Sequence, residues 1–196
     1  MWLLDIDGVI NALSTTPVPG PWTPDQWVQR MVRAEIPGTG PMVLPIFAAE
    51  PVLAFIRDVV RRGAAEVIWH STWRSAAVTD LAPVLGLPAI PVSVAPEWTH
   101  RDPAVWWKLP AARRVVESGR RLVWTDDDIA VLGDQVAELR GRPDTLLIGP
   151  DRRAGLTAQD LERIAAFLEP DVDEPAGSRH HARAGRIGRL LRIGRT

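Results

Sequence analysis

Short apolar runs alternate with amphipathic segments along most of this chain, and this alternation restricts the fold more than any other feature. Residues 2–6, 66–69, 122–125 and 145–148 have the length and composition of buried strands, and residues 89–95 form a weaker candidate. The intervening apolar residues are at helical spacing, which predicts helices over residues 51–62, 75–85, 103–118, 129–139 and 157–168. The alternation therefore predicts an α/β fold of three layers, in which helices cover both faces of a central parallel sheet.

The composition narrows the class of protein. The 196 residues are 46% hydrophobic and 24% charged, close to the average of globular domains, which excludes collagen-like and wholly disordered chains. Cysteine is absent from the sequence, so disulfides, zinc ribbons, iron–sulfur clusters and thiol nucleophiles are excluded. The apolar runs are too short for a membrane span, and Asp5 and Asp7 fall where a secretory signal would be uncharged. We therefore expect no membrane span and a cytoplasmic location.

Two segments depart from the alternating pattern. Residues 12–50 are rich in proline and glycine, which predicts a long excursion without regular structure, and such excursions are often lids. Residues 179–196 contain six arginines and no acid, so the overall charge of −1 conceals an acidic domain followed by a basic tail. We expect residues 1–169 to form one domain, with residues 12–50 as a candidate lid, and residues 170–196 to be disordered.

Polar clusters stand where three of the predicted strands end: Asp5 with Asp7, Ser71 with Thr72, and the acids at residues 126–128. Parallel strands bring their carboxyl ends to one edge of a sheet, so we expect these clusters to converge. Side chains alternate along a strand, which places Asp5 and Asp7 on the same side. Together with residues 126 and 127 they predict an oxygen-only, multi-carboxylate site of the kind that Mg²⁺ prefers.

One basic residue differs from all the others. Lys108 is the single lysine among 23 basic side chains, the rest being arginine. Because a compact ammonium and a planar guanidinium are not interchangeable, we interpret Lys108 as a candidate member of the same site.

These residues resemble, in the same order along the chain, the four motifs of the haloacid dehalogenase (HAD) superfamily. The matching residues are Asp5-Ile6-Asp7-Gly8-Val9, Ser71, Lys108 and the pair Asp126-Asp127. The resemblance extends to residue 168, and the runs at residues 69–74 and 124–128 look most like the small HAD domains associated with RNA repair. It implies a Rossmann-like HAD fold that is capless or has only a minimal lid.

The resemblance also implies a role for each motif residue. Asp5 would be the nucleophile that forms an aspartyl-phosphate, and Asp7 would be the general acid/base that protonates the leaving group and then activates water. Mg²⁺ would be held by Asp5, Asp126 and the backbone carbonyl of Asp7, with Asp127 as a further ligand. An aspartate two residues after the nucleophile is typical of the phosphatases of the superfamily, whereas its dehalogenases lack it. We therefore expect a phosphate ester as substrate.

Charge repulsion supports these roles independently of the resemblance. A carboxylate that attacks a phosphate dianion needs cations nearby, and Mg²⁺ and Lys108 are available. Donors must also hold the equatorial phosphate oxygens, which fits the hydroxyl of Ser71 and the backbone amides after Asp7. Gly8 would permit a close approach of the backbone to the phosphate.

Simpler interpretations exist for most of the candidates. Ser71 or Thr72 could merely cap a helix, and residues 126–128 could be a helix N-terminus stabilised by the macrodipole. Thr72 is also an alternative to Ser71 as the phosphate-binding hydroxyl, while Arg74 is a candidate phosphate contact. We expect His70 to be a core or surface residue rather than a substrate contact.

Two features suggest nucleic acid as a partner. Five tryptophans lie next to the motifs, where aromatic faces could stack on bases, although packing is the commoner use. These are Trp69, Trp73, Trp106, Trp107 and Trp124. The arginines of residues 179–196 alternate with apolar residues, as in segments that bind nucleic acid or anionic membranes, or in a solvated tail.

We expect a Mg²⁺-dependent phosphomonoesterase acting on nucleic-acid ends, nucleotides or small metabolites. The alternatives are a phosphotransferase and a nucleic-acid-binding module without turnover.

Overall fold

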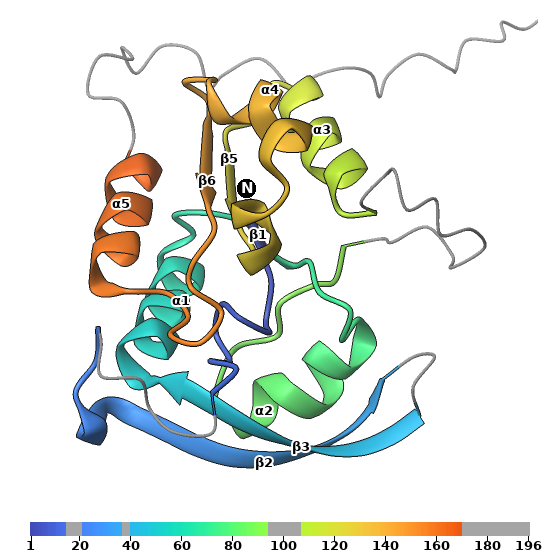
Figure 1. The fold of residues 1–196 in the computed structure, drawn as a ribbon, viewed down its shortest axis with the longest axis vertical. Coiled ribbons are helices and arrows are strands. Elements are labelled where there is room, and N and C mark those ends of the chain that lie inside the picture. Colours follow the sequence, from blue (N-terminus) through green and yellow to red (C-terminus); the bar gives the residue numbers. More distant parts are fainter. Residues whose placement is uncertain (15–20, 37–39, 94–106, 170–196) are drawn as a thin grey trace, which may run out of the picture.

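A parallel sheet forms the centre of the computed structural model, which describes residues 1–14, 21–36, 40–93 and 107–169. The strand order is β4-β1-β5-β6, and all neighbouring pairs are parallel (Figure 1). The strands are β1 (Trp2–Leu4), β4 (Val67–Trp69), β5 (Leu122–Thr125) and β6 (Thr145–Ile148). The predicted α/β class with a central parallel sheet is therefore confirmed.

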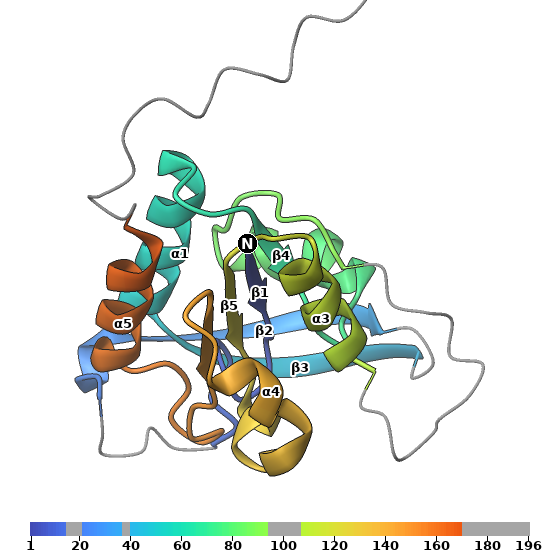
Figure 2. The ribbon, with the colours of Figure 1, turned by 90° about the horizontal axis from the view of Figure 1, so that it is seen from above.

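Helices pack on both faces of this sheet (Figure 2). They are α1 (Glu50–Arg62), α2 (Ala82–Val84, which continues a π-helical turn Ala77–Leu81), α3 (Leu109–Glu117), α4 (Ala137–Arg140) and α5 (Ala158–Leu168). Side chains alternate along each strand, so Trp2 and Leu4 face a large core that includes α1 and α5, whereas Leu3 faces a smaller core that includes α3 and α4. The three layers that the sequence predicts are thus present.

Two helix ends follow the capping signals of the sequence. The chain leaves α1 through Gly63, whose φ of 63° lies in the left-handed region that glycine adopts without strain. At the start of α5, the Thr157 hydroxyl accepts a hydrogen bond from the Asp160 amide, and the Asp160 carboxylate accepts one from the Thr157 amide. This is a capping box with aspartate in its third position.

The expectation of no regular structure in residues 12–50 is wrong. β2 (Trp27–Ile36) and β3 (Gly40–Ala49) form a long antiparallel hairpin that crosses the molecule beyond the carboxyl ends of the parallel strands (Figure 1). Proline argues against a central strand, but both strands of a two-stranded hairpin are edges, where a missing N–H is tolerated. The hairpin is part of the fold rather than an appendage, because five of its side chains are buried in the large core. These are Val32, Ala34, Ile46, Ala48 and Ala49.

Three other expected elements are shorter than predicted. The helix expected from residue 103 begins at Leu109, and residues 103–106 lie outside the described part of the chain. Instead of one helix over residues 129–139, two 3₁₀ turns, Asp127–Ala130 and Gly133–Val136, precede α4. Gly133, which begins the second turn, has a φ of 44° that interrupts an α-helix. The weak strand candidate at residues 89–95 makes one parallel bridge, between Val92 and Trp69.

Some expectations concern residues that the structure does not describe. Residues 170–196, which include the basic tail, and the tryptophan at position 106 lie outside the described residues. Within the described ranges, no helix combines the length and apolar character required to cross a membrane.

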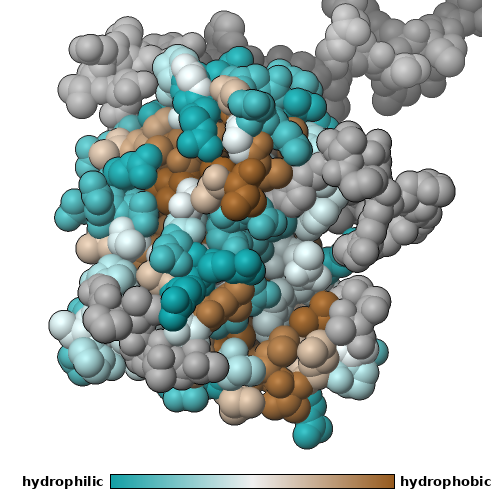
Figure 3. All heavy atoms as spheres, in the orientation of Figure 1, coloured by the Kyte–Doolittle hydropathy of each residue, from teal (hydrophilic) through white to brown (hydrophobic). Residues whose placement is uncertain are grey.

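On the face seen in Figure 3, hydrophilic side chains gather over the loop that joins β6 to α5.

Replacing a buried hairpin side chain should destabilise the whole domain. Ile46 is fully buried, so Ile46→Ala should lower the free energy of unfolding by about 2–5 kcal/mol. Val43 lies on the same strand but is 56% exposed, and Val43→Ala should change that free energy by less than about 0.5 kcal/mol. Urea unfolding of the two variants measures the difference. Equal, small effects would mean that the hairpin does not pack on the core.

Candidate active site

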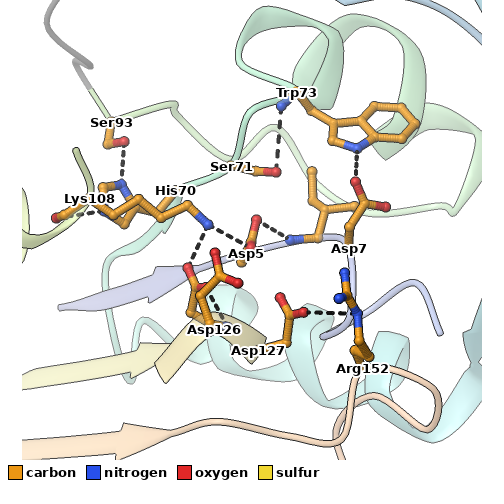
Figure 4. A network of polar contacts seen from close by, with 12 residues as sticks. Asp5, Asp7, His70, Ser71, Trp73, Ser93, Lys108, Asp126, Asp127 and Arg152 are labelled. Atoms are coloured by element: carbon orange, nitrogen blue, oxygen red, sulfur yellow. Dashed lines mark hydrogen bonds and ion pairs between the residues drawn. The ribbon is translucent and has the colours of Figure 1, made fainter. Parts of the chain in front are cut away.

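Two neighbouring strands place the first two carboxylates of the site. Asp5 follows β1 and Asp126 follows β5, and the two strands pair with Leu4 opposite Thr125. The ammonium of Lys108 lies between the two carboxylates, 2.6 Å from Asp5 Oδ2 and 2.5 Å from Asp126 Oδ2 (Figure 4). All three side chains are buried, so these ion pairs are shielded from water. The structure therefore brings together three residues that the sequence analysis assigned to one site.

Asp127 contributes a third carboxylate to the same place. One oxygen from each of Asp5, Asp126 and Asp127 can be chosen so that all three lie within 4.8 Å of one another. The Asp127 carboxylate is partly exposed and lies 3.5 Å from Nε of Arg152, a residue that the sequence analysis did not select. Three of the four carboxylates that the sequence analysis assigned to the metal site thus lie together at the ends of two strands, whereas the Asp7 carboxylate is not part of this group.

The charges of this cluster are not balanced by the protein. Burial raises the pKa of Asp126 well above its ordinary value, and the charge of Asp5 adds to the rise. Burial also raises the pKa of Asp5, although Lys108 opposes the shift. Burial alone would lower the pKa of Lys108, but the charges of Asp5 and Asp126 raise it. Three ionised carboxylates face the ammonium of Lys108 and the more distant guanidinium of Arg152, which leaves one negative charge uncompensated. An all-oxygen donor set with this charge fits a hard divalent cation such as Mg²⁺.

The structure explains the glycine at position 8 by a contact other than the predicted approach to phosphate. Its N–H donates to the backbone oxygen of Asn11, so it is engaged within the chain instead of being directed at a substrate. A Cβ at this position would lie 2.5 Å from Cγ of Asp127, and the φ of 73° also requires glycine. Gly8 therefore makes room for the third carboxylate.

The carboxylate of Asp7 is held by two donors from different parts of the chain. Asn11 Nδ2 donates to Oδ1 and Trp73 Nε1 donates to Oδ2, both over 2.8 Å. Asn11 is itself oriented by the hairpin, because its Oδ1 accepts a hydrogen bond from the Phe47 amide on β3 at 3.0 Å. The sequence analysis did not identify Asn11 or Trp73 as partners of Asp7. The one sequence signal for Asn11 is its position four residues after Asp7, a spacing at which two side chains can meet across a turn.

Lys108 is positioned by a buried histidine. His70 Nε2 lies 3.1 Å from the backbone oxygen of Lys108, and His70 Nδ1 lies 2.6 Å from Ser93 Oγ. A carbonyl oxygen only accepts, so Nε2 carries the proton and Nδ1 accepts from the Ser93 hydroxyl. The imidazole also packs against Trp107, with ring centroids 5.3 Å apart. His70 is thus a core residue, as expected, and it anchors the chain just before α3.

Ser71 and Thr72 differ clearly in exposure. Ser71 is buried, and its hydroxyl is close enough to Asp5 to lower the pKa of that carboxyl, whereas Thr72 is exposed. This arrangement favours Ser71 as the hydroxyl at the centre and leaves Thr72 at its edge. Arg74 is half-buried with a φ of 49°, a left-handed backbone conformation that is strained for a residue with a side chain and is found mainly at functional sites.

Most of the described tryptophans cannot stack on a substrate. Trp69, Trp73 and Trp124 are at most 1% exposed, which agrees with packing, the commoner use, and excludes the alternative of a base-stacking rim for these three rings. Their large apolar faces fill the two cores beside the strand ends. Trp107 is half-buried and packs against His70.

The buried imidazole should make stability depend on pH. Burial lowers the pKa of His70 to about 4, from an ordinary value of 6.5. Between these two values the unfolded chain binds a proton that the native protein does not. The contribution of the neutral imidazole to the free energy of unfolding is therefore complete above pH 6.5 and is lost as the pH falls towards 4. The loss is about 3 kcal/mol. His70→Gln keeps a donor for the Lys108 carbonyl but cannot titrate, so its unfolding free energy, measured in urea from pH 7 to 4, should fall less steeply. Parallel profiles would contradict this.

Comparison with known proteins agrees with the arrangement of the site. The family model described as "HAD domain in Swiss Army Knife RNA repair proteins" matches residues 2–161. Searches of curated proteins and of solved structures gave no match. The family match covers β1, β5 and all the acidic residues described above, and it confirms the resemblance inferred from the motifs. The chain therefore belongs to the HAD-domain family of Swiss Army Knife RNA repair proteins.

Proposed function

We propose that this protein is a Mg²⁺-dependent phosphomonoesterase that forms an aspartyl-phosphate on Asp5 and acts on phosphorylated nucleic-acid ends. The observation that carries the proposal is the grouping of Asp5, Asp126 and Asp127 around the ammonium of Lys108. A nucleophile and the groups that offset phosphate charge are thereby in one place. Membership of a HAD-domain family supports phosphatase-like hydrolysis, and the description of that family as RNA repair proteins supports a nucleic-acid substrate.

The carboxylates supply the ligands for the metal ion. Asp5, Asp126 and Asp127 would hold Mg²⁺ together with the backbone carbonyl of Asp7. When bound, Mg²⁺ would offset the charge of the phosphate oxygens and so reduce the repulsion that a carboxylate nucleophile meets. Lys108 adds a second positive charge from within the protein, and His70 holds the backbone from which that side chain extends.

In the first step, an oxygen of Asp5 forms a bond to phosphorus, and the bond from phosphorus to the leaving oxygen breaks. Asp7 donates a proton to that oxygen, so that the product leaves as a neutral alcohol. Asn11 and Trp73 bind different oxygens of Asp7, which sets the plane of its carboxyl group. The acid is therefore held by residues that take no part in the chemistry.

In the second step, a water molecule attacks the phosphorus of the aspartyl-phosphate while Asp7 accepts its proton. The bond between phosphorus and Asp5 breaks, inorganic phosphate is released, and both carboxyl groups return to their starting states. The same two residues thus serve in both halves of the reaction.

Donors beside Asp5 would hold the oxygens of the transferred phosphate. The buried hydroxyl of Ser71 already contacts Asp5, which supports its role as one of these donors. Thr72 and Arg74 follow it in a turn that leaves Thr72 exposed, and we assign them to the entrance of the site. Orienting the phosphate in line with Asp5 is the main contribution that such donors make.

Removing the nucleophile should abolish turnover without unfolding the protein. In Asp5→Asn the ammonium of Lys108 keeps its ion pair with Asp126, but the amide cannot attack phosphorus, so kcat should fall by about 10³-fold or more. The assay is phosphate release, with Mg²⁺ or with chelator, from 3′- and 5′-phosphorylated oligonucleotides and from nucleoside and sugar monophosphates. Asp134→Asn, at an exposed acid outside the site, is the matched control.

The substrates that release phosphate decide among the candidate functions. Mg²⁺-dependent release from oligonucleotide ends is the expected result. Release from small esters alone would indicate a metabolite phosphatase. Failure of all substrates with wild-type protein would overturn the proposal and favour a binding module, and substantial activity in Asp5→Asn would overturn the mechanism.

Mg²⁺ should stabilise the fold because it relieves the uncompensated charge. At about 100 times its Kd, a ligand adds about 2.7 kcal/mol to the free energy of unfolding, which for a domain of this size raises Tm by roughly 5–10 °C. The shift should disappear with chelator and shrink in Asp127→Asn, whereas Asp134→Asn should retain it. Differential scanning calorimetry measures all three proteins. The same Tm with and without Mg²⁺ in the wild type would argue against a metal site.

A further inference from the structure

We propose that Arg152 determines the specificity of this site by contacting a second negatively charged group on the leaving-group side of the substrate. The inference rests on the proposed phosphomonoesterase activity and adds which esters are preferred. These are esters whose alcohol carries another phosphate, as the terminal nucleotide of a nucleic-acid strand does.

Arg152 stands on the side of the site where the leaving group must lie. Figure 4 shows Asp7, Asp127 and Arg152 on one side of Asp5, with Lys108 and Asp126 on the other. Because Asp7 is the residue that protonates the leaving oxygen, the alcohol is on the same side as Asp7. A charged group on that alcohol is therefore nearer to the guanidinium of Arg152 than to the ammonium of Lys108.

The backbone of Arg152 is fixed against the turn that follows Asp7. Its carbonyl oxygen accepts a hydrogen bond from the Leu13 amide at 2.8 Å, and the Leu156 amide donates to the Val9 oxygen at 2.9 Å. Gly155 makes this close packing feasible, since a Cβ there would lie 2.6 Å from the Val9 oxygen. The loop therefore holds the backbone of Arg152 at a defined place beside the turn that follows Asp7, and the side chain extends from there.

Balancing the charge of Asp127 does not by itself account for Arg152. The contact is 3.5 Å long and involves Nε, while the side chain of Arg152 is 64% exposed. Exposed ion pairs of this kind contribute little to stability. Within the described ranges the guanidinium makes no other hydrogen bond or ion pair, and its two terminal NH₂ groups are available to a ligand. Two parallel N–H donors match the non-bridging oxygens of a phosphate.

Two kinds of substrate offer this chemistry. In a nucleic-acid strand, the nucleotide that bears the terminal phosphomonoester is joined through a phosphodiester to the next nucleotide. In a nucleoside 3′,5′-bisphosphate, the second group is a free phosphate on the same sugar. The shared feature is a phosphate on the alcohol that leaves, and we take the strand end as the physiological form because the family is described by RNA repair.

The experiment compares Arg152→Gln with wild type on matched substrates. These are a phosphorylated oligonucleotide, a nucleoside 3′,5′-bisphosphate and p-nitrophenyl phosphate, whose leaving group carries no second phosphate. A lost charge-assisted hydrogen bond corresponds to a 10- to 100-fold effect. We expect kcat/KM on the oligonucleotide to fall by this factor relative to p-nitrophenyl phosphate, mainly through KM. Arg152→Lys should recover part of the loss, and Arg153→Gln, which removes the same charge one residue away, is the control.

A bisphosphate that behaves like the oligonucleotide would show that any second phosphate suffices. A loss confined to the oligonucleotide would assign the contact to the phosphodiester. An equal loss on all three substrates would overturn the inference, because Arg152 would then act by holding Asp127. An unchanged ratio in Arg152→Gln, or an equal change in Arg153→Gln, would overturn it as well.

A binding measurement separates failure of this inference from failure of the proposed activity. In the Asp5→Asn background, fluorescence anisotropy of a labelled phosphorylated oligonucleotide should give a weaker Kd when Arg152→Gln is added, and the slope of log K against log salt should fall by about one. This result would support the contact even if no ester were hydrolysed. Identical Kd values with and without Arg152→Gln would overturn it regardless of turnover.

Discussion

The ammonium of Lys108 between two buried carboxylates is the interaction on which the rest of the site depends. Moving a carboxylate out of water costs several kcal/mol unless a partner of opposite charge replaces the water. Lys108 serves two such groups at once, at 2.6 Å and 2.5 Å. A planar guanidinium is less suited to a position between two single carboxylate oxygens. This gives a physical reason why position 108 is lysine when the other basic side chains counted with it are all arginine. The imidazole of His70 binds the Lys108 carbonyl just before α3, and this contact fixes the backbone from which the ammonium extends.

Charge balance links this interaction to function. One ammonium cannot neutralise three carboxylates, so the site keeps a residual negative charge. Burial raises the pKa of both Asp126 and Asp5, and the charge of Asp5 raises the pKa of Asp126 further. A cation bound between these carboxylates would offset that charge. Around this centre the protein adds neutral supports, such as the glycine that leaves room for Asp127 and the indole that binds Asp7.

The sequence could predict the parts of this site that depend on local order. Asp5, Ser71 and Asp126 each stand at the end of a short apolar run, and parallel strands necessarily bring such ends together. The partners of Asp7 were not predictable in this way, because Trp73 lies 66 residues from it and only the tertiary fold joins them. The hairpin was missed for a different reason: its prolines argue against strands in the interior of a sheet, whereas this hairpin has only edges. For the tryptophans the sequence left packing and base stacking both open, because proximity to a motif in sequence does not reveal which face of a strand a ring occupies.

The hydrogen bonds around Asp7 also tie catalytic competence to the completion of folding. A chain of contacts runs from the Phe47 amide through Asn11 to Asp7 and on to Trp73, and so joins the hairpin, the turn after β1 and the segment before α2. Local opening of the hairpin would release Asn11 and, with it, the orientation of Asp7, the proposed acid/base, while leaving the four-stranded sheet paired. The short motif at residues 5–8 is therefore insufficient on its own: an incompletely folded chain contains the motif but lacks the geometry. The proposed activity would thus require the whole domain to be folded.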